Sequence, residues 1–193
     1  MKTLLTAGAV LAIAGAASAT ELQKLVIIDL TVPNQVTVTA TDGVSFSDAS
    51  GSDTTGIYLE NFYGAAGGSL GASLVSGDFT NFENPSDNSP SLFRGGAGAD
   101  PGLNIWSFSS DSTVTFTAGG QAFTGSATWT LDADDYADMI AGGERGGDLY
   151  FPADTVDDLP GAVLLGTWNV IIPTPGTAGL LGLAGLAAVR RRR

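Results

Sequence analysis

Four aspartates close together in the last third of the chain offer the densest group of oxygen ligands in the sequence. They are Asp132, Asp134, Asp135 and Asp138. Carboxylates at short spacing suit calcium, but this stretch lacks the central glycine and the glutamate at the twelfth position of an EF-hand loop. The same residues suit the start of a helix, because Asp132 can cap it, Asp135 can reach back to that cap, and acids in the first turn favour the helix dipole. We expect a short helix near 132–141, with calcium binding as the alternative use of the four carboxylates.

The residue types present limit the catalytic chemistry. The chain contains no histidine and no cysteine, which rules out a Ser-His-Asp triad, a cysteine nucleophile and a zinc site with His or Cys ligands. A glycosidase pair of carboxyls remains open, because such pairs are defined by a separation of about 5 to 9.5 Å in space. We assign no catalytic residue, and no cofactor other than calcium. Five aromatic residues are candidates either for stacking on a sugar ring or for ordinary core and edge packing: Tyr58, Tyr63, Trp106, Tyr150 and Trp168.

Alternating threonines mark a second candidate surface between residues 113 and 131. If Gly119 and Gly120 close a two-residue hairpin, Phe116 lies opposite Phe123. One face of the pair then carries apolar residues, namely Val114, Phe116, Phe123, Ala127, Trp129 and Leu131. The other face carries hydroxyls, namely Thr113, Thr115, Thr117, Thr124, Ser126, Thr128 and Thr130. Threonine is common on solvated strands, so this is either an ordinary solvent-facing surface or a flat hydroxyl array that contacts polysaccharide or ice.

The elements that must position these side chains are mostly β-strands. Apolar and polar residues alternate with a period of two in many short segments, and turn residues such as Asp42-Gly43 separate them. The expected strands are 22–30, 35–41, 103–109, 112–118, 121–131, 149–151 and 163–172. This pattern predicts an all-β fold, specifically a single antiparallel β-sandwich of jelly-roll type over residues 20–172.

Charge is distributed very unevenly along the chain. All 20 acidic residues, but only Lys24, Arg94 and Arg145 among the basic ones, lie between residues 20 and 172, so three positive charges face twenty negative ones and leave −17. A surface of this sign repels nucleic acid and anionic lipid. We therefore expect no nucleic-acid partner.

The first 19 residues have the layout of a secretory signal peptide. Lys2 supplies a positive start, residues 4–14 are apolar, and Ala17-Ser18-Ala19 places small residues where signal peptidase reads them. The apolar run is too short to span a membrane. We expect export, with signal peptidase cutting after Ala19.

The last 21 residues form a second targeting segment. Pro173, Thr174 and Pro175 interrupt regular structure, and residues 177–189 carry no charge. Four arginines follow, namely Arg190, Arg191, Arg192 and Arg193. Counted from residue 170, the apolar stretch has a length of about 30 Å as a helix, just enough to cross the hydrocarbon core. The arginines favour the cytoplasmic side, so we expect a C-terminal hydrophobic helix that anchors the protein transiently.

This order of prolines, apolar segment and arginine cluster resembles the PEP-CTERM sorting domain of Gram-negative-type bacteria. The resemblance covers residues 173–193, with Thr174 in place of the glutamate usual between the two prolines. It implies that a membrane-embedded exosortase recognises the tail and that the cargo passes to the cell surface or the exopolysaccharide matrix. It implies nothing about residues 20–172.

Together the two ends and the acidic middle predict an exported protein of the cell envelope or extracellular matrix, anchored in the membrane before processing. We expect a noncatalytic structural or adhesive role, in which the domain contacts exopolysaccharide. A carbohydrate- or calcium-binding module is the first alternative, and a glycoside-active enzyme is the second.

Overall fold

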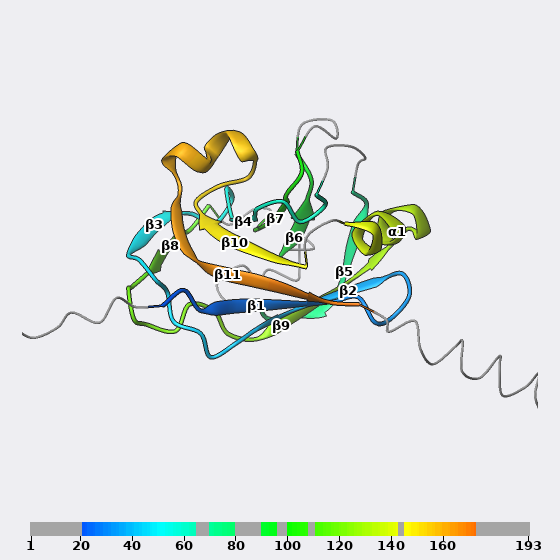
Figure 1. The fold of residues 1–193 in the computed structure, drawn as a ribbon, viewed down its shortest axis with the longest axis horizontal. Coiled ribbons are helices and arrows are strands. Elements are labelled where there is room, and N and C mark those ends of the chain that lie inside the picture. The colour runs from blue at the N-terminus through cyan, green and yellow to red at the C-terminus, as the bar shows by residue number, and fades with distance from the viewer. Residues whose placement is uncertain are drawn as a thin grey trace, which may run out of the picture.

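A computed structural model describes residues 21–64, 70–79, 90–95, 100–107, 111–142 and 145–172. β-Strands are the main regular structure in this part of the chain (Figure 1). The main sheet has nine strands in the order β5-β9-β2-β1-β11-β10-β4-β7-β6. In chain order they are β1 (Lys24–Asp29), β2 (Gln35–Ala40), β4 (Ile57–Leu59), β5 (Ala72–Gly77), β6 (Ser91–Phe93), β7 (Leu103–Trp106), β9 (Ser126–Leu131), β10 (Gly146–Phe151) and β11 (Val163–Ile171).

The remaining elements are short. A second sheet pairs β3 (Ala49–Ser52) with β8 (Thr113–Phe116). The helix α1 (Ala133–Ala141) follows β9, and the 3-10 helix η3 (Val156–Gly161) connects β10 to β11. No helix among the described residues is long and apolar enough to cross a membrane.

The main sheet is mixed and curls into a near-barrel. Its strands pair in antiparallel fashion except for β1 and β11, which run parallel at its centre. The two end strands, β5 and β6, approach each other. A hydrogen bond ties this seam: the indole Nε1 of Trp129 on β9 donates to the carbonyl of Pro90, just before β6, at 2.8 Å.

The alternating pattern of the sequence explains which residues fill the interior. On β2, Val36 and Val38 are buried, while Thr39, which points to the other side of the strand, is exposed. Phe116 on β8 packs the small sheet against the same core. The centre of its ring lies 5.2 Å from the ring centre of Phe123 and 4.9 Å from that of Phe151. The two sheets therefore share one hydrophobic core.

The prediction of an all-β domain with a short helix near 132–141 is confirmed, but the antiparallel jelly-roll sandwich is not. The parallel pairing of β1 with β11 joins the first and last described strands, and it makes the main sheet mixed. A period-two pattern identifies strands without naming their partners. Residues 1–20 and 173–193, including the expected signal peptide and C-terminal hydrophobic helix, lie outside the described residues.

The predicted hairpin around Gly119 and Gly120 is wrong in its pairing. Strand β8 pairs with β3, so Phe116 lies opposite Ala49, and β9 pairs with β2 and β5. The glycine loop instead bonds to Ser45, whose carbonyl accepts from the Gly119 N–H and whose N–H donates to the Gly120 carbonyl, both at 2.8 Å. The inward-facing set predicted for this region is nevertheless confirmed, since all six apolar residues are buried.

Candidate ligand-binding pocket

The register of β6 and β7 places one amide and two aromatic side chains on a common face. Asn104 and Trp106 are two residues apart on β7, and side chains at that spacing point to the same side of a strand. Phe93 on β6 lies directly opposite Asn104. The adjacent residues Leu92 on β6 and Ile105 on β7 are paired with each other, face the core instead and are buried.

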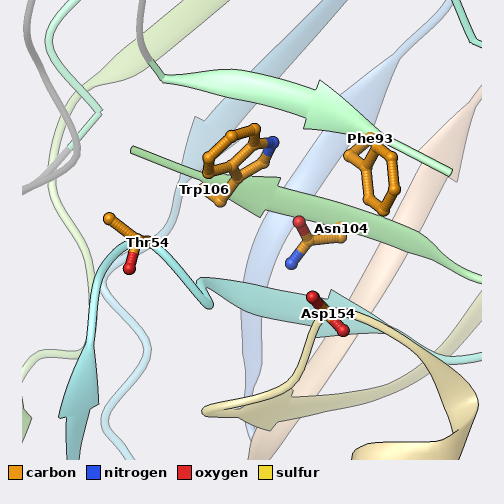
Figure 2. Close-up of a pocket in the computed structure, with 5 residues that line it drawn as sticks. All are labelled: Thr54, Phe93, Asn104, Trp106 and Asp154. Atoms are coloured by element: carbon orange, nitrogen blue, oxygen red, sulfur yellow. The ribbon is translucent and has the colours of Figure 1, made fainter. Parts of the chain in front are cut away.

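Two loops complete a pocket over this face. Thr54 comes from the turn between β3 and β4, and Asp154 from the segment between β10 and η3. Together with Phe93, Asn104 and Trp106 they line a cavity of about 230 Å³. Figure 2 shows all five side chains around the same space. The Phe93 side chain is 40% exposed, so one wall of the pocket is open to solvent.

Asn104 is locked in a single orientation. It is 1% exposed, and its Nδ2 lies 2.8 Å from the carbonyl oxygen of Thr55 and 3.0 Å from those of Ile57 and Ala153. Turning the amide over would place its oxygen against three carbonyl oxygens, which repel it. The amide oxygen therefore stays on the side of Trp106 and Phe93, as Figure 2 shows, where it offers a hydrogen-bond acceptor.

Asp154 belongs to a pair of interacting carboxyls. Burial, followed by a hydrogen bond to the Asp158 carboxyl and the nearby charges, raises the pKa of Asp154 to about 6. The pKa of Asp158 is lowered, first by that hydrogen bond from Asp154 and then by backbone donors. Those donors are the N–H groups of Asp154 at 3.1 Å and Thr155 at 3.2 Å. The proton of the pair therefore resides on Asp154, the residue that faces the pocket.

The buried carboxylate of Asp100 fixes the segment that carries Asp154. Asp100 is 3% exposed and accepts hydrogen bonds from the Tyr58 hydroxyl, from the Gly102 N–H at 2.8 Å and from the Val156 N–H at 2.7 Å. Burial and this carboxylate raise the pKa of the Tyr58 phenol, so the phenol remains a donor. Because Val156 begins η3, the bond from its N–H holds the start of η3 against the sheet.

A second hollow is acidic and lacks aromatic walls. Glu60, Asn61, Gly146, Gly147 and Asp148 line about 280 Å³ near the start of β10. Burial and, after it, the charge of Asp148 raise the pKa of Glu60. Two carboxyls and no aromatic ring make this hollow a poorer fit for an organic ligand than the pocket around Trp106.

The four aspartates proposed for calcium are not gathered into a cage. Asp132 is the N-cap residue of α1, but its side chain forms no cap hydrogen bond, and Asp134 lies in the first turn. Asp135 does not reach back to the cap as predicted; it accepts from the Gly71 N–H at 2.8 Å. Asp138 lies 3.6 Å from the Arg94 guanidinium. Within the described ranges, no group of three or more acidic side chains is placed to hold a metal ion.

The predicted hydroxyl array is divided between two sheets. Thr113 and Thr115 belong to β8, whereas Thr128 and Thr130 belong to β9. The β9 hydroxyls also have partners within the sheet: Thr128 lies 2.8 Å from the Thr37 hydroxyl, and Thr130 donates to the Ser73 carbonyl at 3.4 Å. These threonines therefore do not form one flat surface.

Of the five aromatic residues considered for sugar stacking, Trp106 lines the pocket. Tyr58, Tyr63 and Trp168 are buried, and Tyr150 is half-buried on β10. The alternation of β7 was enough to place Trp106 and Asn104 on one face. The sequence offered no comparable signal for Thr54, Phe93 and Asp154, because each arrives from a separate part of the chain. Ala17, Ala19, Pro173, Thr174, Pro175 and Arg190 to Arg193 lie outside the described residues.

Comparison with known proteins adds no relative. No family model, characterised protein or solved structure matches this chain.

Proposed function

We propose that this protein is an exported, noncatalytic component of the cell surface or extracellular matrix, and that its β-domain adheres to polysaccharide through the pocket around Trp106. The observation that carries the proposal is the meeting of two aromatic side chains, Phe93 and Trp106, with the fixed amide oxygen of Asn104 and the Asp154 carboxyl. Sugars have apolar C–H faces that pack on aromatic rings and hydroxyls that need oriented hydrogen-bond partners.

The size of the pocket suits one ring of a longer glycan. Pockets that enclose a drug-sized ligand measure roughly 300 to 1,000 Å³, and this cavity is about 230 Å³. Its open wall at Phe93 leaves room for the glycan chain to continue beyond the bound ring. Many copies of such a weak single-ring contact would hold the protein in a matrix by avidity.

Export and sorting form the second part of the proposal. A signal peptide over 1–19 sends the chain across the membrane, and the 173–193 tail, with its C-terminal hydrophobic helix, anchors it until an exosortase-like enzyme acts near Pro173, Thr174 and Pro175. The end of β11 supports this, because the strand stops at Ile171 and leaves the prolines beyond the last described strand. A strongly acidic domain also suits a salty extracellular setting, where dissolved ions screen the repulsion between its charges.

Binding is favoured over hydrolysis by the spacing of the carboxyls. The carboxyl groups of Asp154 and Asp158 are in hydrogen-bond contact. A glycosidase needs its two carboxyls about 5 to 9.5 Å apart, so that a sugar carbon or a water fits between them. This pair leaves no such space, and Asp158 is already bonded to the backbone of Asp154 and Thr155.

The test is glycan binding by the full chain, measured on immobilised exopolysaccharide fragments with matched aromatic variants. Phe93→Ala removes a pocket wall, and Phe46→Ala removes a ring of nearly equal exposure outside the pocket, 39% against 40%. We expect Phe93→Ala to weaken binding by about tenfold or more, equivalent to about 1.4 kcal/mol, and Phe46→Ala to leave it unchanged. Equal binding by the two variants, or no glycan binding at all, would contradict the proposal.

A further inference from the structure

We propose that the pocket around Trp106 selects saccharides that carry a free amine, in preference to N-acetylated or uronic acid units. This inference rests on the proposed function and names the sugar class that the pocket takes. It follows from what the pocket offers to a ligand: hydrogen-bond acceptors, aromatic faces and negative charge.

The acceptor character is built into the fold. The orientation of Asn104 is fixed by its contacts with three carbonyl oxygens, so its oxygen faces the side of Trp106 and Phe93. The hydroxyl of Thr54 is already 2.7 Å from the Ser52 hydroxyl, with which it shares a hydrogen bond. A ligand that donates hydrogen bonds therefore fits this lining better than one that accepts them.

The local charge points in the same direction. Asp154 faces the cavity, Asp158 is hydrogen-bonded to it, and Asp100 is close enough to influence its ionisation. An ammonium group brings three donors and a positive charge to such a site. It is also attracted to the faces of aromatic rings such as Trp106 and Phe93.

Competing sugar types fit less well for identifiable reasons. A uronic acid would bring a carboxylate beside the carboxylate of Asp154, and two negative charges in one pocket repel each other. An N-acetyl group removes the positive charge and presents an additional carbonyl acceptor to the acceptor of Asn104. A lysine side chain has the right charge, but a cavity of about 230 Å³ with two aromatic walls suits a ring better than a narrow alkyl chain.

The experiment compares three oligosaccharides of equal length with the full chain by calorimetry: a glucosamine oligomer with free amines, its N-acetylated counterpart and a uronic acid oligomer. At about pH 6.5 Asp154 is mostly ionised, since its pKa is about 6. We expect the amine oligomer to bind about tenfold tighter than the N-acetylated one, as a single charge-assisted contact allows, and the uronic acid oligomer not to bind.

Two variants test the role of the carboxyl. Asp154→Asn keeps the shape and removes the charge, so the preference for the amine should fall to near unity while the N-acetylated oligomer still binds. Asp157→Asn, at an exposed position in η3, should keep the full preference. If both variants lose the preference for the amine oligomer, the preference comes from the overall negative charge of the domain and not from Asp154, and the inference is overturned.

The remaining outcomes separate this inference from the function on which it rests. Equal or tighter binding of the N-acetylated oligomer overturns the amine preference and leaves polysaccharide binding intact. Absence of binding to all three oligomers, and to immobilised exopolysaccharide, overturns both. Binding of a lysine-rich peptide that depends on Asp154, without binding of any sugar, would assign the pocket to a protein amine and overturn the saccharide assignment.

Discussion

The interaction between Asp154 and Asp158 gives one side chain of the pocket an unusual titration. The pKa of Asp154 rises from 3.8 to about 6, mainly because burial disfavours its charged form and then because of its bond to Asp158. Between these two values the folded protein keeps a proton that the unfolded chain releases. The contribution of this group to the free energy of unfolding therefore falls as the pH rises through that window.

A pH series with Asp154→Asn tests this behaviour. The variant cannot titrate at this position, so its free energy of unfolding should decline less than that of the wild type between pH 3.8 and about 6. Asp158 acts in the opposite sense, because its lowered pKa gives stability that is lost as the pH falls. Urea unfolding at each pH provides the measurement, with Asp157→Asn as control. Parallel curves for wild type and Asp154→Asn would rule out the raised pKa.

At the scale of single residues, the sequence could indicate which side chains were candidates for a binding site, but not which of them lie together in the pocket. Trp106 was identifiable as an aromatic on an alternating strand, and the chemistry excluded by the absence of histidine and cysteine follows from composition. Phe93 and Asp154 reach the pocket through strand pairing and a loop, which depend on contacts distant in sequence. The aspartates at the start of α1 show the converse: they are close along the chain, yet among the described residues no group of three or more acidic side chains is placed to hold a metal ion.

At the scale of elements, Arg94 connects three segments at the end of the main sheet. It follows β6, its guanidinium lies 3.7 Å from the ring centre of Tyr63 in the turn after β4, and it pairs with Asp138 on α1. Arg94 is 7% exposed overall, whereas the Asp138 side chain is 55% exposed. The stacked ring and the buried guanidinium should therefore stabilise this junction more than the ion pair does.

Substitutions on the two sides of this ion pair should have unequal effects. Arg94→Ala should lower the free energy of unfolding by roughly 2–3 kcal/mol through lost burial and the lost cation–π contact. Asp138→Asn should cost less than about 1 kcal/mol, because the carboxylate of the pair is 55% exposed and screened by solvent. Chemical denaturation measures both, and Asp134→Asn on the same helix serves as control. A cost for Asp138→Asn as large as that for Arg94→Ala would mean that the ion pair dominates.

The positions of the strands and the helix in the sequence were more predictable than the pairing between strands. The strands 35–41, 103–109 and 163–172 and the helix near 132–141 follow from local patterns, and the observed elements β2, β7, β11 and α1 fall within these ranges. Pairing failed where a loop had a competing partner. Gly119 and Gly120 suit a hairpin turn, yet Ser45 takes the hydrogen bonds that would have closed it.

At the scale of the molecule, the first and last described strands form the centre of the main sheet. Strand β11 lies between β1 and β10, and its Leu165 and Trp168 are buried. The near-barrel therefore cannot close until the last strand is present. Local sequence patterns could not predict this pairing of strands that are far apart in the chain. The pairing distinguishes the observed fold from the predicted sandwich.

Two truncations test this dependence. Residues 20–172 alone should be soluble and unfold in one cooperative transition, because they contain every described strand and the whole core. A chain that stops at residue 162 lacks β11 and should fail to fold. Thermal unfolding followed by circular dichroism distinguishes them. Aggregation of 20–172 would show instead that the tail contributes to the fold.

The parallel direction of β1 and β11 also sets which end of the domain lies away from Ile171, where the last strand ends. In Figure 1 both strands begin on the side of η3 and run toward the opposite end. The pocket is level with the beginning of β11: Asn104 lies opposite Tyr58, which lies opposite Tyr150. Tyr150 in turn lies opposite Leu164.

Leu164 and Ile171 are seven residues apart, which in a strand is about 23 Å at about 3.3 Å per residue. If the proposed tail is held in the membrane, β11 acts as a rigid spacer that keeps the pocket at that distance from the lipid. The pocket proposed to bind polysaccharide would then lie clear of the membrane surface until the domain is released.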